Sequence, residues 1–217
     1  MNIESTDRIL AARLLGIGAV LLRPGEPFTW ASGWRSPIYC DNRRILSDPD
    51  VRSFVAEELA KKASALYPDA GIVAGVATGA IAHGVLAADR MGKPFVYVRP
   101  KPKDHGTKSQ IEGNLPKEAK VVVIEDLVST GMSSLAAVDT LRGAGAEVLG
   151  MVAIFTYGFD IASERFKEAG VRLDTLTDYG ALIEEATAQG LVGPEEAPTL
   201  AEWRLNPVDW NRETING

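Results

Sequence analysis

The fold of this chain is decided by residues 121–134, which read Val121-Val122-Val123-Ile124-Glu125-Asp126-Leu127-Val128-Ser129-Thr130-Gly131-Met132-Ser133-Ser134. The stretch opens with four β-branched apolar residues, a run typical of a strand that is buried on both faces in a parallel sheet. Two carboxylates follow where we expect this strand to end. A turn rich in hydroxyls comes next, and apolar residues at helical spacing follow the turn. The pattern therefore predicts a strand, an acidic edge, a loop and a helix.

The turn after the predicted strand has the properties of a phosphate-binding loop. Backbone N–H groups at the start of a helix are unpaired donors at the positive end of the helix dipole. Gly131 allows a tight turn and a close approach to an anion, and hydroxyl donors flank it at Ser129, Thr130, Ser133 and Ser134. The two carboxylates can accept hydrogen bonds from hydroxyls, so a sugar phosphate would suit both halves. The alternative is an ordinary strand-to-helix turn with a capped helix.

Two other kinds of nucleotide loop are excluded in this stretch. No Gly-Lys-Ser/Thr follows, as a Walker-type loop requires, and the dinucleotide fingerprint G-x-G-x-x-G is missing.

The composition of the chain limits the classes of protein to which it can belong. A chain of 217 residues is long enough for one sizeable α/β domain. A net charge of −6 argues against a broad nucleic-acid-binding surface. The polar, acidic start is unlike a signal peptide, and no apolar run approaches the ~20 residues that span a bilayer. The single cysteine, Cys40, forms no internal disulfide and fits a reducing cytosol. We therefore expect a cytoplasmic protein that binds neither nucleic acid nor membrane.

Strand and helix patterns alternate from residue 71 to residue 179, which predicts an α/β fold with a mainly parallel, twisted sheet flanked by helices. Strands are expected at 71–77, 94–99, 121–124, 147–157 and 171–175. We treat residues 1–217 as a single domain, with the core sheet over about 70–180. Residues up to about 45 contain two short strand patterns, at 28–30 and 37–40, and are expected to form a small N-terminal hood over the mouth of the sheet. The tail from Pro194 is expected to pack back on the body.

A cationic loop follows the second core strand. Residues 99–108 contain four basic side chains and a histidine, and two prolines and a glycine exclude regular structure there. The following segment, 109–116, is expected to extend the loop. A long structureless loop in a compact domain is usually a lid, a binding loop or a disordered segment. A solvated charge run is the alternative interpretation.

Residues 121–134 resemble the PRPP (phosphoribosyl diphosphate) motif of the type I phosphoribosyltransferases. In that family the acidic pair holds the ribose 2- and 3-hydroxyls, and the loop wraps the 5-phosphate. The mobile catalytic loop of the family has the pattern Arg-x-x-x-Lys-x-His-Gly, which matches Arg99, Lys103, His105 and Gly106. The resemblance thus implies that Arg99, Lys103 and His105 are catalytic. The implied PRPP-binding set is Arg99, Lys103, His105, Glu125, Asp126, Leu127, Val128, Ser129, Thr130, Gly131, Met132 and Ser133. A second strand-to-helix turn, at Thr78-Gly79, would face the diphosphate.

Residues 28–39 narrow the resemblance to the orotate phosphoribosyltransferases, in which this segment forms part of a hood near the pyrimidine. The resemblance assigns orotate contact to Ser129. Ala31 stands where many members carry a lysine, and Tyr157 or Gly158 stands where some carry an arginine. No role follows from the resemblance for Lys101, Arg43, Arg44 or Tyr157.

The implied enzyme is a pentosyl-transferring glycosyltransferase of pyrimidine (UMP) biosynthesis. It would convert PRPP and orotate into orotidine 5-phosphate and diphosphate. Mg²⁺ would be bound mainly through PRPP or diphosphate, with the carboxylates assisting through water and with no direct protein ligand assigned. The family acts as a homodimer whose mobile loop reaches the partner's site. Two alternatives stay open: a purine or uracil phosphoribosyltransferase of the same fold, and a regulator that only senses PRPP.

Overall fold

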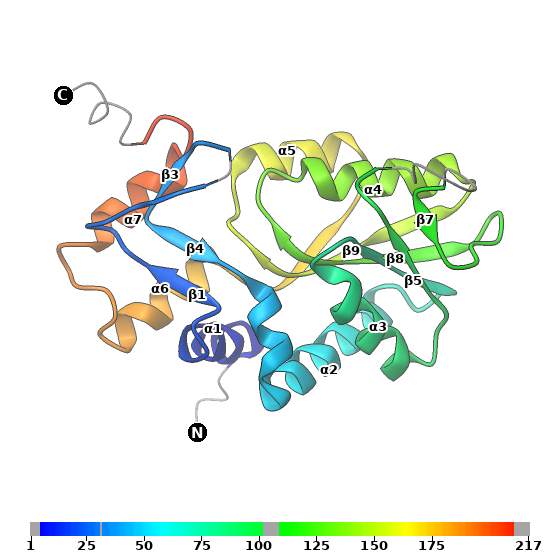
Figure 1. The fold of residues 1–217 in the computed structure, drawn as a ribbon, viewed down its shortest axis with the longest axis horizontal. Helices are drawn as coiled ribbons and strands as arrows, with labels where there is room; N and C mark the ends of the chain where they lie inside the picture. The colour runs from blue at the N-terminus through cyan, green and yellow to red at the C-terminus, as the bar shows by residue number, and fades with distance from the viewer. Residues whose placement is uncertain (1–4, 31, 102–108, 211–217) are drawn as a thin grey trace. The chain divides into compact units, whose positions relative to one another are not determined.

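The computed structural model describes residues 5–30, 32–101 and 109–210. The chain divides into two compact units, one formed by Met1–Ile45 with Thr177–Gly217 and the other by Leu46–Leu176. Figure 1 shows the elements of both units along the chain. In the described ranges, no helix is both long enough and apolar enough to cross a membrane.

The second unit is built on a six-stranded sheet with the order β10-β9-β8-β5-β6-β7. Its strands are β5 (Ile72–Val76), β6 (Phe95–Val98), β7 (Ile111–Glu112), β8 (Lys120–Val128), β9 (Glu147–Thr156) and β10 (Leu173–Asp178), the last ending just inside the first unit. The pairs β5–β6, β5–β8 and β8–β9 are parallel, and β6–β7 is antiparallel. The predicted mainly parallel sheet is confirmed.

Two details of this sheet differ from the sequence expectation. Strand β8 continues to Val128, so the acidic pair lies inside the strand and not beyond its end. Residues 109–116 were expected to be loop, but Ile111 and Glu112 pair with β6. The basic loop is therefore the connection of an antiparallel hairpin. A two-residue strand leaves too short a pattern to be recognised from sequence.

Helices cover both faces of the sheet. Helices α2 (Pro49–Leu66) and α3 (Ala80–Met91) lie on one face, and α4 (Met132–Gly143) and α5 (Asp160–Glu168) lie on the other (Figure 1). Helix α3 leads from β5 to β6, whereas α4 leads from β8 to β9 in the opposite direction along the sheet. Because crossovers between parallel strands are right-handed, a reversal of direction sends the two helices to opposite faces. The winding therefore reverses between β5 and β8, a position that holds the ligand in folds of this kind.

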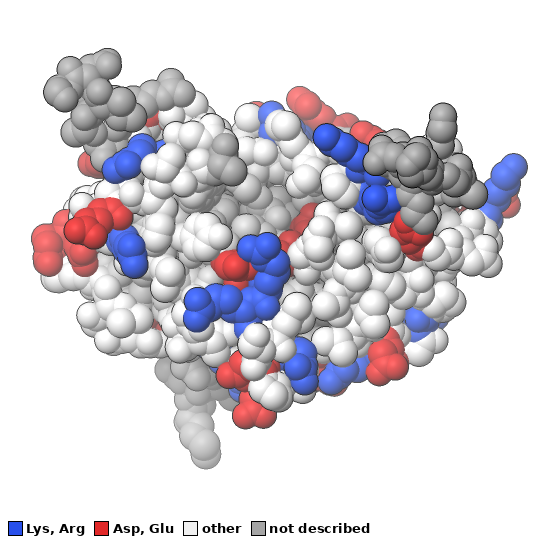
Figure 2. All heavy atoms as spheres, in the orientation of Figure 1, with Lys and Arg blue, Asp and Glu red and all other residues white. Residues whose placement is uncertain are grey.

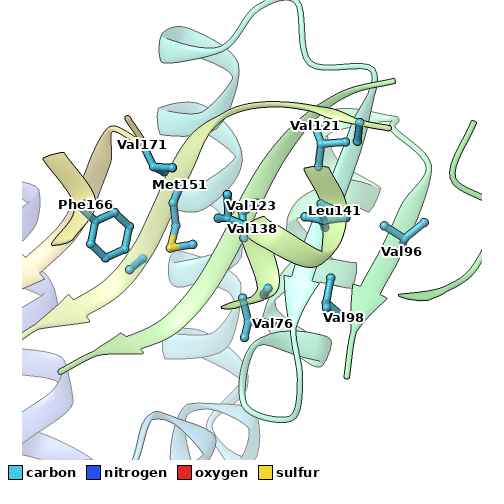
Figure 3. Packing of buried hydrophobic residues seen from close by; sticks show 14 of the residues in the cluster. Val76, Val96, Val98, Val121, Val123, Val138, Leu141, Met151, Phe166 and Val171 are labelled. Carbon is cyan, nitrogen blue, oxygen red and sulfur yellow. The ribbon is translucent and has the colours of Figure 1, made fainter. Parts of the chain in front are cut away.

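The core between the sheet and α4 consists of branched aliphatic side chains (Figure 3). Val121 and Val123 of β8 meet Val138 and Leu141 of α4, and Met151 of β9 fills the space beside them. All five side chains are fully buried. The apolar run that opens residues 121–134 thus serves as the central strand, as predicted.

Helix α3 approaches the sheet closely on the other face, because two glycines meet under an aromatic ring. The Phe95 ring of β6 lies across Gly75 of β5 and Gly84 of α3. A Cβ added at Gly75 would lie 2.9 Å from the ring, and one added at Gly84 would lie 2.6 Å from it. This contact sets how close α3, and with it the turn before α3, lies to the strands.

The first unit contains helices α1 (Thr6–Gly16), α6 (Tyr179–Ala188) and α7 (Ala197–Leu205) and two small antiparallel pairs. The pairs are β1 (Val20–Leu22) with β4 (Ile38–Cys40) and β2 (Phe28–Thr29) with β3 (Arg35–Ser36), and a 3-10 helix, η1 (Asn42–Ser47), follows β4. Trp203 of α7 is fully buried; its indole N–H donates to the Arg35 carbonyl at 3.1 Å, and its ring meets Trp30 edge-on. The strands expected at 28–30 and 37–40 exist, but they do not pair with each other. Strand β2 pairs with β3, and β4 pairs with β1. That residues up to 45 act as a hood stays a prediction.

We predict that Gly84→Ala destabilises the protein by about 1–3 kcal/mol, because the added methyl group forces the Phe95 ring or α3 to shift. The measurement is urea unfolding at equilibrium. Gly143→Ala is the matched control, since it is also a helical glycine and no described atom lies within 4 Å of its added Cβ. The control should be neutral or gain up to ~1 kcal/mol from helix propensity. Equal effects of both changes would contradict the close packing.

Candidate active site

The candidate site lies at the carboxyl ends of β5 and β8, where the winding of the sheet reverses. The turn after β5 contains Thr78 and Gly79, and its Ala77–Thr78 peptide bond is cis. The loop after β8 contains Ser129, Thr130 and Gly131. Because parallel strands end at the same edge of a sheet, the two strand-to-helix turns singled out from the sequence lie at one crevice edge.

Asp126 belongs to β8 but contacts the turn before α3. A Cβ added at Gly79 would overlap both carboxylate oxygens of Asp126, so only a glycine leaves room for the carboxylate. Gly79 itself has φ −60° and ψ −40°, ordinary helical values. The glycine is therefore required by the close approach of Asp126 and not by its own backbone conformation. Asp126 is partly exposed.

Glu125 points to α4 instead. Its side chain is only 3% exposed. One carboxylate oxygen, Oε2, accepts a hydrogen bond from the Ser134 hydroxyl at 2.8 Å, and the other, Oε1, accepts from the Asp126 backbone N–H at 2.9 Å. Side chains alternate between the two faces along a strand, so neighbours in β8 reach elements on opposite faces of the sheet. The two acids are adjacent in sequence and differ in environment.

The burial of Glu125 has an electrostatic consequence. Loss of solvation raises the pKa of Glu125 well above its usual range, and the neighbouring Asp126 carboxylate raises it further. The hydrogen bonds from Ser134 and from the Asp126 N–H act in the opposite direction, because they favour the charged form. The buried member of the acid pair thus holds its proton more tightly than an exposed glutamic acid.

In the loop after β8, the Gly131 N–H points away from α5. Arg165 of α5 donates to the Thr130 carbonyl at 2.9 Å, and in a trans peptide unit the following N–H points the opposite way. Gly131 has φ 79°, and a Cβ there would come within 3.0 Å of the Phe166 ring. Within the described part of the chain, the N–H groups of residues 129–133 donate no hydrogen bond. These donors at the start of α4 are available to an anion.

Arg99 and Ser133 line one cavity of about 380 Å³, together with the last residues of β5. The Arg99 N–H donates to the Gln110 carbonyl at 2.8 Å, and its guanidinium lies 3.7 Å from the Glu112 carboxylate. The hairpin β6–β7 therefore brings the first residue of the basic loop next to the start of α4.

Comparison with known proteins identifies the family. A family model for the phosphoribosyl transferase domain matches residues 51–182. Orotate phosphoribosyltransferase of Porphyromonas gingivalis is 52% identical over 207 residues, covering 95% of this chain and 99% of that protein. The chain belongs to the orotate phosphoribosyltransferase family.

Solved structures agree with this family assignment. The crystal structure of orotate phosphoribosyltransferase from Aeropyrum pernix has a TM-score of 0.73 and 35% identity, and the match covers 85% of this chain and 99% of that one. The Mycobacterium tuberculosis orotate phosphoribosyltransferase in complex with PRPP has a TM-score of 0.64 and 25% identity, with 81% and 98% covered. The type I phosphoribosyltransferase fold expected from the sequence is confirmed.

Several residues that the family resemblance singled out lie outside the described residues, among them Lys103, His105, Gly106 and Ala31. Of the residues left without a role, Lys101 is exposed, and Arg43 pairs with Asp41 at 2.6 Å and lowers the pKa of that carboxyl. Tyr157 is buried and stacks on Phe159. The implied PRPP-binding set also contains Leu127 and Val128, which end β8, and Met132, which begins α4.

Sequence reasoning missed two contacts of the candidate site, Ser134 with Glu125 and Gly79 with Asp126. The Ser134 hydroxyl was expected to face an anion. The first has a recognisable signal, since a buried serine at helical spacing among apolar residues needs a partner. The second has none, because Thr78-Gly79 and Asp126 are far apart in sequence.

We predict that Glu125→Gln reduces the pH dependence of stability. The pKa of Glu125 is raised in the folded protein from an ordinary value of 4.5, so the folded state holds a proton that the unfolded chain releases above that pH. The stability from this group is fully present below pH 4.5 and is lost as pH rises toward the folded pKa. The variant lacks this loss, so its free energy of unfolding should rise relative to the unmodified chain as the pH increases above 4.5.

The measurement is urea unfolding at several pH values without ligand. Glu164→Gln, at an exposed position of α5, is the control for the loss of a carboxylate that is not buried. A difference between Glu125→Gln and the unmodified chain that stays constant over this range would contradict the assigned environment.

Proposed function

We propose that this chain transfers the ribose 5-phosphate group of PRPP to orotate, giving orotidine 5-phosphate and diphosphate, in the biosynthesis of UMP. The proposal rests on the polar groups found at the carboxyl ends of β5 and β8. There the Asp126 carboxylate lies against Gly79, and the N–H groups of residues 129–133 donate no hydrogen bond within the described residues. Both features support a seat for ribose 5-phosphate. The membership of the orotate phosphoribosyltransferase family supplies the reaction.

PRPP binds, in this proposal, with its ribose hydroxyls toward Glu125 and Asp126 and its 5-phosphate in the loop Ser129–Ser133. Carboxylates accept hydrogen bonds from hydroxyls, and backbone N–H groups at a helix start donate to phosphate. Asp126 is the more accessible of the two acids, because Glu125 is nearly enclosed. Ser129 is the proposed orotate contact.

We propose that Mg²⁺ is held mainly by the substrate. Among the residues that the structure describes, no group of three or more His, Cys, Asp or Glu side chains could hold a metal ion. Both oxygens of Glu125 already accept hydrogen bonds. When bound, Mg²⁺ would neutralise charge on the departing diphosphate. Asp126 and Glu125 would assist the ion through water.

The basic loop completes the proposed mechanism. The bond between the ribose and the diphosphate breaks, and a ring nitrogen of orotate forms a bond to the same ribose carbon. Negative charge leaves with the diphosphate, and positive charge develops on the sugar. Arg99, Lys103 and His105 would stabilise the leaving diphosphate when the loop closes, and closure would keep water away from the activated sugar. We propose a homodimer in which this loop serves the partner's site, as in the family. A two-fold dimer is the commonest oligomer.

Surface charge and cysteine use support the remaining proposals, which are a cytoplasmic protein and no nucleic-acid partner. On the face drawn in Figure 2, basic and acidic side chains occur in small groups of both signs. The net charge is −6. Cys40, the single cysteine of the chain, is buried and forms no internal disulfide, which suits a reducing compartment.

The deciding experiment is an assay of diphosphate release from PRPP and Mg²⁺ in the presence of orotate, uracil, hypoxanthine or adenine. Release that depends on orotate, with orotidine 5-phosphate formed in equal amount, is the expected result. Release with another base would favour a purine or uracil phosphoribosyltransferase. PRPP binding without release with any base would favour a PRPP-sensing regulator.

We predict that Gly79→Ala impairs PRPP use more than it impairs folding. The added methyl group displaces the Asp126 carboxylate, while the backbone accepts alanine without strain. The catalytic efficiency (kcat/KM) for PRPP should fall by a factor on the order of 10–100, as expected for a misplaced binding group. Gly16→Ala, where no described atom lies within 4 Å of the added Cβ, is the control. Unchanged kinetics in Gly79→Ala would show that Asp126 does not contact PRPP.

We predict that Lys103→Ala lowers kcat by a factor on the order of 100, equivalent to about 3 kcal/mol of lost transition-state stabilisation, with little change in thermal stability. The physical reason is the loss of a cation beside the leaving diphosphate. Single-turnover product formation is the measurement, and Lys117→Ala, at an exposed position near Gly145, is the control. A near-normal rate would remove the loop from the mechanism.

A further inference from the structure

The two halves of the proposed seat belong to different elements. The acid pair is part of β8, whereas the phosphate-binding N–H groups begin α4, and the turn of residues 129–131 separates them. The sugar of a ribose 5-phosphate holds the hydroxyls and the phosphate at a fixed distance from each other. Tight binding therefore requires that β8 and the start of α4 keep a fixed spacing.

One buried side-chain hydrogen bond joins Glu125 of β8 to the first turn of α4. The Ser134 hydroxyl donates to Glu125 Oε2 at 2.8 Å across nine positions of sequence. Ser134 is 1% exposed, and Glu125 is 3% exposed, so water does not compete for this contact. A buried hydrogen bond to a carboxylate is among the stronger polar contacts, and losing its donor leaves the carboxylate poorly solvated.

The Glu125 carboxylate, held by Ser134, also binds the backbone of Asp126. Its second oxygen accepts from the Asp126 backbone N–H at 2.9 Å. The Asp126 side chain in turn rests on Gly79 at the start of α3. A chain of contacts thus runs from the first turn of α4 through both acids to the turn before α3.

We propose that Ser134 is a positioning residue for the sugar phosphate: its hydroxyl holds Glu125 and thereby fixes the acid pair relative to the phosphate-binding start of α4. The inference rests on the proposed function, because it assumes that PRPP occupies this seat. Ser134 itself is enclosed by protein, so it acts through Glu125 and not by touching the substrate.

A purely structural role for Ser134 makes a different prediction. If the hydroxyl only satisfied a buried carboxylate, its loss would lower the stability of the protein and weaken all ligands alike. If the hydroxyl sets the spacing, its loss must lower the affinity for a ligand that contacts both halves more than the affinity for a ligand that contacts one half. Ribose 5-phosphate contacts both halves, and inorganic phosphate contacts only the start of α4.

The test compares Ser134→Ala and Ser134→Cys with the unmodified chain by calorimetric titration of ribose 5-phosphate and of inorganic phosphate. In Ser134→Ala the dissociation constant for ribose 5-phosphate should rise about tenfold and that for phosphate less than about twofold. Ser134→Cys keeps the size but donates weakly, so its effect should be intermediate. Thr187→Ala is the control, since it removes a hydroxyl that bonds only the Ile183 carbonyl in α6.

Kinetics give a second readout on the same variants. Ser134→Ala should raise KM for PRPP about tenfold and leave KM for orotate unchanged. Equal weakening of ribose 5-phosphate and phosphate, or no weakening of either, would overturn the positioning role. If Ser134→Ala does not fold, Ser134→Cys decides by the same criterion. An unmodified chain that binds neither PRPP nor ribose 5-phosphate would instead overturn the proposed function.

Discussion

The site depends on one constraint, the reversal of winding between β5 and β8. Crossovers that leave two adjacent parallel strands in opposite directions go to opposite faces, so no helix covers the shared carboxyl end of these strands. The start of α3 and the start of α4 both open at this edge. Everything assigned to substrate binding among the described residues stands on one of these two turns, on β8 or at the end of β6.

Because β8 continues past Ile124, the two side chains of the acid pair point to opposite faces of the sheet. Alternation along the strand turns Glu125 to α4 and Asp126 to the turn before α3, so one acid is enclosed and the other borders the crevice. The enclosed acid is suited to hold its neighbours in place, and the accessible one is suited to meet a ligand. A pair that looks equivalent in sequence thus has two physical tasks.

The sequence predicts the central strand, the phosphate loop and the parallel sheet because each has a local signal. Four β-branched residues in a row, Val121 to Ile124, have few structural alternatives, and Gly131 marks the turn. The end of β8 is not predictable in this way, since charged residues inside a strand are tolerated where the chain borders a site. The pairing of β7 with β6 and the contact of Gly79 with Asp126 depend on tertiary approach, which leaves no periodic pattern.

The hairpin β6–β7 has a consequence for variation among relatives. The segment between Arg99 and Gln110 starts and ends on adjacent backbone positions that are hydrogen-bonded to each other. Insertions or deletions there leave the pairing of the six strands intact, and the entropy of closing a longer connection grows only logarithmically. A change in the length of this segment therefore need not disturb the strands that form the seat at β5 and β8.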